Sequence, residues 1–144
     1  MTPKNIPTPE FPDRKSIGER DWGTEDLLVL SPGKYTLKLL QIKAGNKGGL
    51  QFHRKKDESA YVLSGELLLR YDSGDGVLEE KVVSQGQWFR FPPGCIHQEE
   101  ALTDVSLIEV SSPHFNDRVR VEESYGLKRK GGLDSTKESE IIEK

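Results

Sequence analysis

Four side chains in the middle of this chain could each give a metal ion a lone pair. They are Gln51, His53, Glu58 and His97. Gln51 and His53 are two residues apart, so on a β-strand both would point to the same face. Imidazole nitrogens, a carboxylate and an amide oxygen suit a borderline divalent cation such as Zn, Mn, Fe, Co or Ni. Three or four protein ligands would leave room for water or a substrate oxygen, so the pattern predicts a metal site open to a substrate.

Turn residues set the spacing of these four side chains. The first three lie in residues 45–65, a stretch that begins and ends with glycine. The fourth closes residues 86–97, after a Pro-Pro-Gly turn at 92–94. Glycine permits tight turns, and proline followed by glycine turns the chain back inward. Ligands at fixed offsets among turn residues are harder to produce by chance than a single pair of histidines.

Short strands surround these two stretches. The apolar or alternating segments are residues 27–30, 35–42, 60–63, 67–71, 77–83, 88–91 and 105–110. Gly, Pro and Asp turns separate them, and Ser64-Gly65-Glu66 is predicted to be a hairpin turn. Many short strands with such turns indicate an all-β sandwich or barrel. The aromatic residues expected in its core are Tyr61, Trp88, Phe89 and Phe91.

The two ends of the chain differ from its middle. Residues 1–19 contain four prolines among charged residues, which predicts an extended arm. Residues 128–144 are rich in Lys, Glu, Ser and Gly, which predicts a disordered charged tail. The folded domain is therefore expected over residues 20–127, and a length of 144 residues fits one domain.

Composition excludes several classes of protein. A net charge of −3 argues against a general nucleic-acid binder, which needs a basic field. No apolar run approaches the length of a membrane span, and the first residues show no signal-peptide core. Cys95 is the single cysteine, so no intramolecular disulfide can form. We therefore expect a cytoplasmic protein without a nucleic-acid or membrane partner.

The two stretches resemble the two signature motifs of the cupin superfamily. Residues 45–65 match G-x5-H-x-H-x3–4-E-x6-G, with Gln51 in place of the first histidine. Residues 86–97 match G-x5-P-x-G-x2-H-x3-N up to the histidine, and Ala101 replaces the final asparagine. The resemblance implies the cupin double-stranded β-helix, an all-β jelly-roll barrel.

A narrower similarity is to the C-terminal cupin of type II mannose-6-phosphate isomerases. The matching segments are R-D-W-G at 20–23, Y-T-L-K at 35–38, Q-F-H at 51–53 and N-D-R-V-R-V-E-E-S-Y-G at 116–126. The resemblance implies that Gln51, His53, Glu58 and His97 are metal ligands below a phosphorylated-sugar site. Two departures bear on activity: Arg54-Lys55 replaces a run of histidines, and Leu127 replaces an arginine. Metal binding is thus better supported than isomerase chemistry.

The leading hypothesis is a metal-dependent aldose–ketose isomerase that acts on a sugar or sugar phosphate. Its candidate bases are Glu58 and Lys38, one of which would move a proton between adjacent carbons. Lys38, Lys56 and Arg120 are the predicted substrate-binding residues. Lys38 has an equally simple alternative as a strand lysine that faces solvent, and Arg120 could belong to a surface pair.

Two alternatives remain at this level. The barrel could be a non-catalytic module that binds a sugar or another small molecule, with or without a metal. It could also be a metal-dependent dioxygenase, since one fold supports many reactions. We further expect a homodimer in which the proline-rich arm crosses between subunits.

Overall fold

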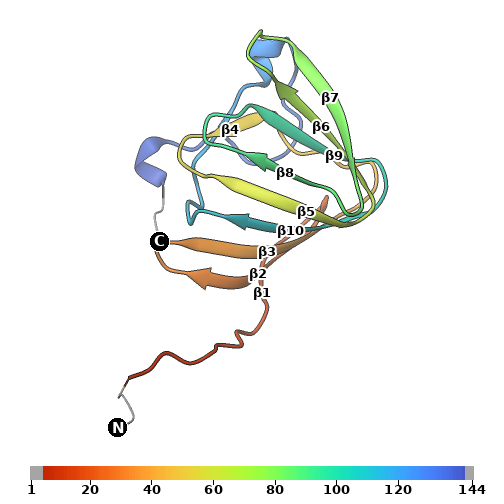
Figure 1. Ribbon diagram of the computed structural model, residues 1–144. Helices are drawn as coiled ribbons and strands as arrows, with labels where there is room; N and C mark the ends of the chain where they lie inside the picture. The colour runs from red at the N-terminus through yellow and green to blue at the C-terminus, as the bar shows by residue number, and fades with distance from the viewer. Residues whose placement is uncertain (1–4, 142–144) are drawn as a thin grey trace.

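Short strands form a barrel of two antiparallel sheets in this computed structural model, which describes residues 5–141 (Figure 1). The strands are β1 (Lys15–Arg20), β2 (Gly23–Ser31), β3 (Tyr35–Ile42), β4 (Gln51–His53), β5 (Glu58–Ser64), β6 (Glu66–Asp72), β7 (Leu78–Ser84), β8 (Trp88–Phe91), β9 (His97–Ala101), β10 (Val105–Ser111) and β11 (Arg118–Arg120). Two short 3-10 helices follow, η1 (Glu122–Tyr125) and η2 (Glu138–Glu140).

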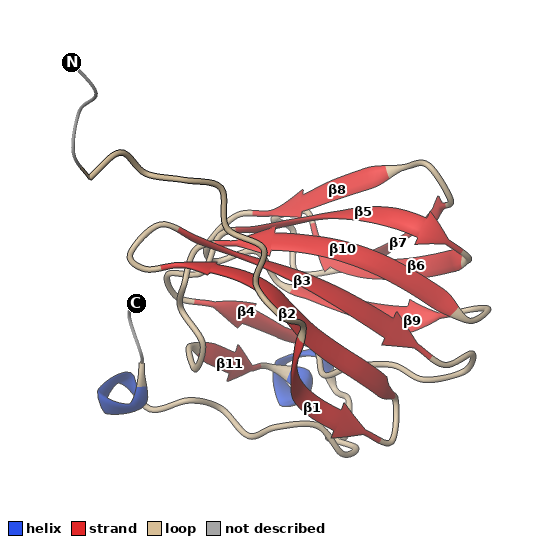
Figure 2. Cartoon of the chain, turned by 90° about the horizontal axis from the view of Figure 1, so that it is seen from below, coloured by secondary structure: helices blue, strands red, loops and turns tan. Residues whose placement is uncertain are grey.

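The strands divide between two layers. Within the described residues, one sheet has the order β1-β2-β3-β10-β5-β8 and the other has the order β11-β4-β9-β6-β7. Figure 2 shows the first sheet in front of the second. Consecutive strands often lie in different sheets, which is the topology of a jelly roll. The predicted all-β cupin barrel is confirmed.

The interior of the barrel changes character along its strands. On β3 the inward residues run from Thr36 and Lys38 to Leu40 and Ile42, and all four are buried. The neighbouring strands follow the same order because Glu109 of β10 pairs with Lys38, and Leu107 pairs with Leu40. One end of the barrel is therefore apolar, and the other end is polar and charged.

The apolar end holds the hydrophobic core. It joins residues from both sheets, namely Leu40, Ile42, Val62, Leu67, Leu69, Val83, Phe91, Ala101, Val105 and Leu107. Trp22, Phe89 and Cys95 are partly buried against this cluster. The core thus fastens the two sheets together at one end and leaves the other end for polar side chains.

The turn at Gly65 differs from the predicted hairpin. β5 pairs with β10 and β8, whereas β6 pairs with β7 and β9, so the turn carries the chain from one sheet to the other. Gly65 has a φ of 91°, and a Cβ at this position would lie 2.1 Å from the carbonyl oxygen of Asp104. Only glycine fits this crossing without a shift of the backbone.

Two of the four aromatic residues expected in the core lie on the outer surface. Trp88 is 73% exposed and Tyr61 is 45% exposed, and their rings stack with centroids 6.4 Å apart. Both residues face outward because inward and outward positions alternate along a strand. Phe91 is buried as expected, and Phe89 packs against the core.

The two ends of the chain contact the barrel to different degrees. Residues 1–4 of the predicted arm and 142–144 of the predicted tail lie outside the described residues. β1 overlaps the end of the predicted arm and pairs with β2, whereas the preceding residues run away from the barrel (Figure 1). In the tail, Thr136 is 3% exposed and lies against the barrel. No helix of the described residues has the length and apolar character to cross a membrane.

We predict that Gly65→Ala lowers the free energy of unfolding by at least about 2 kcal/mol. The alanine would be strained by the positive φ, and its Cβ would clash with the backbone. Gly45→Ala is the matched control, because Gly45 has a φ of 84° but nothing within 4 Å of an added Cβ. Urea unfolding of the two variants measures the difference. Equal losses of stability would show that the crossing at Gly65 tolerates a side chain.

Candidate metal centre

Three of the predicted ligands converge at the charged end of the barrel. Candidate ligand atoms of His53, Glu58 and His97 all lie within 4.8 Å of one another. His53 ends β4, Glu58 begins β5 and His97 begins β9, so the barrel topology brings them together from separate strands. Oε1 of Glu58 is 3.4 Å from Nε2 of His97 and 3.7 Å from Nε2 of His53. One carboxylate oxygen therefore faces two imidazole nitrogens.

The other nitrogen of each imidazole is already engaged. Nδ1 of His97 donates to the carbonyl oxygen of Cys95 at 2.9 Å. Nδ1 of His53 donates to the carboxylate of Asp117, also at 2.9 Å. Each contact fixes the ring orientation and turns the Nε2 atom toward Glu58. Metal-binding histidines are usually held by such outer partners.

Asp117 also organises the loop between β4 and β5. Its Oδ2 accepts hydrogen bonds from the backbone amides of Lys55 at 2.7 Å and Lys56 at 2.9 Å. Burial alone would raise the pKa of Asp117, but these bonds and the one from His53 hold the pKa at about 2. Asp117 is therefore an ionised acceptor. The sequence places it in the segment 116–126 that carried a family resemblance, but gives no sign that it contacts His53.

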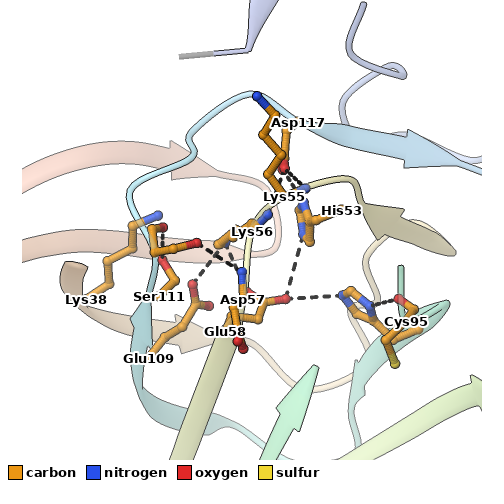
Figure 3. A network of polar contacts seen from close by, with 12 residues as sticks. Lys38, His53, Lys55, Lys56, Asp57, Glu58, Cys95, Glu109, Ser111 and Asp117 are labelled. Carbon is orange, nitrogen blue, oxygen red and sulfur yellow. Dashed lines mark hydrogen bonds and ion pairs between the residues drawn. The ribbon is translucent and has the colours of Figure 1, made fainter. Parts of the chain in front are cut away.

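Lys56 links the cluster to a second carboxylate (Figure 3). Its Nζ is 3.0 Å from Oε2 of Glu58 and 3.1 Å from Oε1 of Glu109. Burial opposes the charge of Lys56, but the two carboxylates raise its pKa. Lys56 is therefore a permanent cation that holds Glu58 by the oxygen that does not face the imidazoles.

Lys38 lies one step further along the same chain of charges. It is 5% exposed, so the alternative of a solvent-facing lysine is wrong. Its Nζ is 3.0 Å from Oε1 of Glu25 and 5.3 Å from the centre of the Phe115 ring. Lys38 lies opposite Glu109 on the neighbouring strand. The polar end of the barrel is thus filled by alternating carboxylates and ammonium groups.

The ionisation of the three convergent groups follows from these contacts. Burial would raise the pKa of Glu58, but the charge of Lys56 and the bond to His97 hold it well below its ordinary value. Burial would lower the pKa of His97, but its bonds to Cys95 and Glu58 raise it to about 10. Burial lowers the pKa of His53 despite the bond to Asp117. Glu58 is consequently ionised beside one protonated and one neutral imidazole.

Glu99 is a further acidic group that sequence reasoning missed. It is two residues after His97 on β9, so both side chains share the inward face. Burial and the charge of Glu58 raise its pKa to about 8. A carboxyl group with such a pKa can hold or release a proton near neutrality. The sequence shows Glu99 only as one of two consecutive glutamates on a strand that was not predicted.

Two predicted site residues are not established members of the cluster. Gln51 pairs with His97 across the sheet, so the two share a face, and its side chain makes no hydrogen bond within residues 5–141. Its role as a ligand stays a prediction. The Arg120 guanidinium instead donates to Glu122 and to the carbonyl oxygens of Gly131 and Leu133.

The donors present fit a divalent cation. Two imidazole nitrogens and a carboxylate oxygen face one another, and His–His–carboxylate sets bind Zn²⁺, Fe²⁺ and similar ions. Their outer contacts to Asp117, Cys95 and Lys56 already hold the orientation that such binding requires. A cation at this position would replace the proton on His97.

We predict that Asp117→Asn weakens divalent-metal binding about 10- to 100-fold, the usual effect of losing an outer partner of a metal-binding histidine. Both carboxylate oxygens of Asp117 accept hydrogen bonds, whereas an asparagine has one accepting oxygen and one donating NH₂ group. Its NH₂ group would therefore face another donor, either Nδ1–H of His53 or the two backbone amides. Asp72→Asn is the control, since Asp72 also accepts backbone amides, those of Gly74 and Gly76, but in the β6–β7 turn. Calorimetric titration with Mn²⁺, Co²⁺ or Zn²⁺ gives the affinities. Unchanged affinity in Asp117→Asn would contradict this assignment.

Known proteins share both sequence and fold with this chain. Mannose-1-phosphate guanylyltransferase RfbM of Salmonella typhimurium (strain LT2) is 30% identical over 116 residues, which cover 76% of this chain and 23% of that protein. The chain therefore spans about a quarter of that relative.

Solved structures confirm the fold at lower identity. KdgF from a Halomonas species has a TM-score of 0.62 and 20% identity, with 76% of this chain and 97% of that chain covered. The capsular polysaccharide assembling protein CapF of Staphylococcus aureus has a TM-score of 0.59 and 22% identity, with 69% and 28% covered. Residues 38–111 match the family described as "Cupin domain", a range that contains all four predicted ligands. The chain therefore belongs to the cupin family.

Proposed function

We propose that this protein is a divalent-metal-dependent isomerase that interconverts the aldose and ketose forms of a sugar or sugar phosphate. The observation that carries the proposal is the convergence of His53, Glu58 and His97 with both Nδ1 atoms already engaged. The sugar class is supported by the similarity to RfbM, a mannose-1-phosphate guanylyltransferase, and by the fold shared with CapF. The resemblance to the cupin domain of type II mannose-6-phosphate isomerases points to the same class.

His53, Glu58 and His97 would hold the cation, and Gln51 is the proposed fourth ligand. When bound, a divalent cation supplies Lewis acidity that polarises a carbonyl or hydroxyl oxygen of an open-chain sugar. Lys56 holds Oε2 of Glu58, which leaves Oε1 turned toward the imidazoles. Glu58 is accordingly the proposed base that moves a proton between adjacent carbons.

Each of the three cationic residues that are predicted to bind substrate already contacts a carboxylate. Lys38 is bound to Glu25, Lys56 to Glu58 and Glu109, and Arg120 to Glu122. A cation that already contacts a carboxylate would have to exchange that partner in order to bind phosphate. Substrate binding by Lys38, Lys56 and Arg120, and catalysis by Lys38, therefore stay predictions.

We predict that the chain loaded with Mn²⁺, Co²⁺, Ni²⁺, Zn²⁺ or Fe²⁺ interconverts mannose 6-phosphate and fructose 6-phosphate. Glu58→Gln should lower kcat by at least about 100-fold, because it removes both a proposed metal ligand and the proposed base. Glu80→Gln is the control, because Glu80 is an exposed carboxylate on β7. Turnover is followed by NMR in D₂O, where deuterium at C2 reports the proton transfer.

Two other outcomes would replace this proposal. Sugar-phosphate binding in a thermal-shift assay without turnover by any metal form would favour a non-catalytic binding cupin. Oxygen consumption by the Fe²⁺ form would favour a dioxygenase. The two alternatives are thus separated by assays on the same preparations.

We further propose a homodimer formed through the outer face of the six-stranded sheet. This face exposes Tyr61, Trp88 and Val110, and large exposed apolar patches mark interaction surfaces. A second copy is the proposed occupant because the arm that precedes β1 also exposes apolar side chains, and Phe11 in this arm is 89% exposed. Figure 1 shows this arm running away from its own barrel.

We predict that sedimentation equilibrium finds twice the chain mass of 16.2 kDa and that Trp88→Glu shifts the protein to monomer. A buried charge in an apolar interface is costly, which is why the variant should dissociate. Val82→Glu is the control, since Val82 is 44% exposed on the other sheet. A monomeric wild-type chain at micromolar concentration would contradict the dimer.

A further inference from the structure

β4 carries His53 and is weakly held by the sheet. It has three residues and pairs with β9 through Gln51 and His97 alone among the described residues. Its other side pairs with β11, which also has three residues and forms the edge of the five-stranded sheet. The position of His53 therefore depends on a short edge strand. Short edge segments are among the first parts of a fold to open locally.

The C-terminal residues 131–136 cover this edge. The amide of Thr136 donates to the carbonyl oxygen of Arg118 at 2.6 Å, and the amide of Arg120 donates to Oγ of Ser135 at 3.0 Å. Thr136 is nearly inaccessible to solvent. Two outer hydrogen-bonding groups of β11, the carbonyl of Arg118 and the amide of Arg120, are therefore satisfied by the chain's own tail, in the way that an added strand would satisfy them.

Arg54 joins the same segment to the far end of β4. It follows His53 directly, and its Nη1 donates to the carbonyl oxygen of Thr136 at 3.0 Å. Its backbone amide donates to the carbonyl oxygen of Asp117, the residue whose carboxylate orients the His53 ring. Thr136 thus contacts both β11 and the residue that follows His53.

Arg120 joins the segment to the near end of β4. Its Nη1 donates to the carbonyl oxygens of Gly131 and Leu133, and its other guanidinium nitrogens donate to Glu122. Glu122 in turn accepts the amide of Leu50 at 3.2 Å. Leu50 directly precedes β4, so the buried Arg120–Glu122 pair connects the tail with the start of this strand.

We infer that residues 131–136 form a clamp that holds β4 in place, and that Arg120 and Arg54 are positioning residues for His53. The inference rests on the proposed metal centre and is independent of the sugar chemistry. When the clamp is absent, β4 and β11 open more often and His53 spends less time in the binding orientation. The apparent metal affinity falls in proportion to the population that remains competent.

Two truncated chains test the clamp. One ends at Lys130 and lacks residues 131–136, and the other ends at Lys137 and keeps them but lacks η2. Absorbance titration with Co²⁺ gives the affinity and the ligand-field bands, and mass-spectrometric hydrogen exchange gives the opening of residues 51–53. The β6–β7 hairpin serves as an internal reference for global stability.

The chain ending at Lys130 should bind Co²⁺ at least tenfold more weakly and exchange faster at residues 51–53, with the β6–β7 hairpin unchanged. The chain ending at Lys137 should match the full chain. Equal affinity and equal exchange in both truncated chains would overturn the clamp. Faster exchange throughout the protein would also overturn it, since that result indicates a general loss of stability.

A point variant covers the case in which the shorter chain does not fold. Arg54→Met removes one tie and leaves the tail in place, so it should weaken Co²⁺ binding and speed exchange at residues 51–53. Wild-type behaviour in Arg54→Met would then overturn the clamp. If the full chain binds no divalent metal, the metal proposal fails, and the exchange data alone decide the clamp.

Discussion

The ionised carboxylate of Glu58 inside the barrel is the constraint on which the charged end of the structure depends. An unpaired buried charge costs several kcal/mol, so Glu58 requires compensating groups. Lys56 supplies one at 3.0 Å, and the two imidazoles lie on the other side. Lys56 in turn is shared with Glu109, which lies opposite Lys38, and Lys38 is bound to Glu25. Removing one member would leave its neighbour uncompensated, so these groups act as a unit.

This concentration of charge is possible because the barrel separates it from the hydrophobic core. Leu40, Leu107 and Val62 lie side by side on neighbouring strands and belong to the core that joins both sheets. One inward position further along, Lys38 and Glu109 replace the apolar pair. Burial of apolar side chains at one end thus stabilises the fold, so the other end can hold charged side chains that contribute little to the hydrophobic core.

The two imidazoles are oriented by different parts of the chain. His97 is held by a carbonyl oxygen two residues away, so the turn before β9 fixes it locally. His53 is held by Asp117, sixty-four residues later, and therefore depends on how the C-terminal part of the chain packs on the barrel. The relatives share the cupin fold, and a fold alone does not define a reaction. Contacts of this kind are where members of such a family can differ.

The sequence by itself determined the strand-rich barrel and the positions of most turns, because period-two patterns and turn residues act locally. The spacing of His53, Glu58 and His97 among those turns also marked them as candidate ligands. The sequence does not determine which strands pair: the turn residues at Gly65 predict a hairpin, whereas the chain there crosses from one sheet to the other. Alternation on β3 showed that Leu37 and Lys38 face opposite ways, but not which of them faces inward. Only the tertiary structure decided that, because Glu25 and Glu109 on other strands lie beside Lys38 and compensate its buried charge. The contacts of Asp117 and Arg120 were likewise decided by long-range packing, since their partners are defined by distance in space rather than by spacing in the chain.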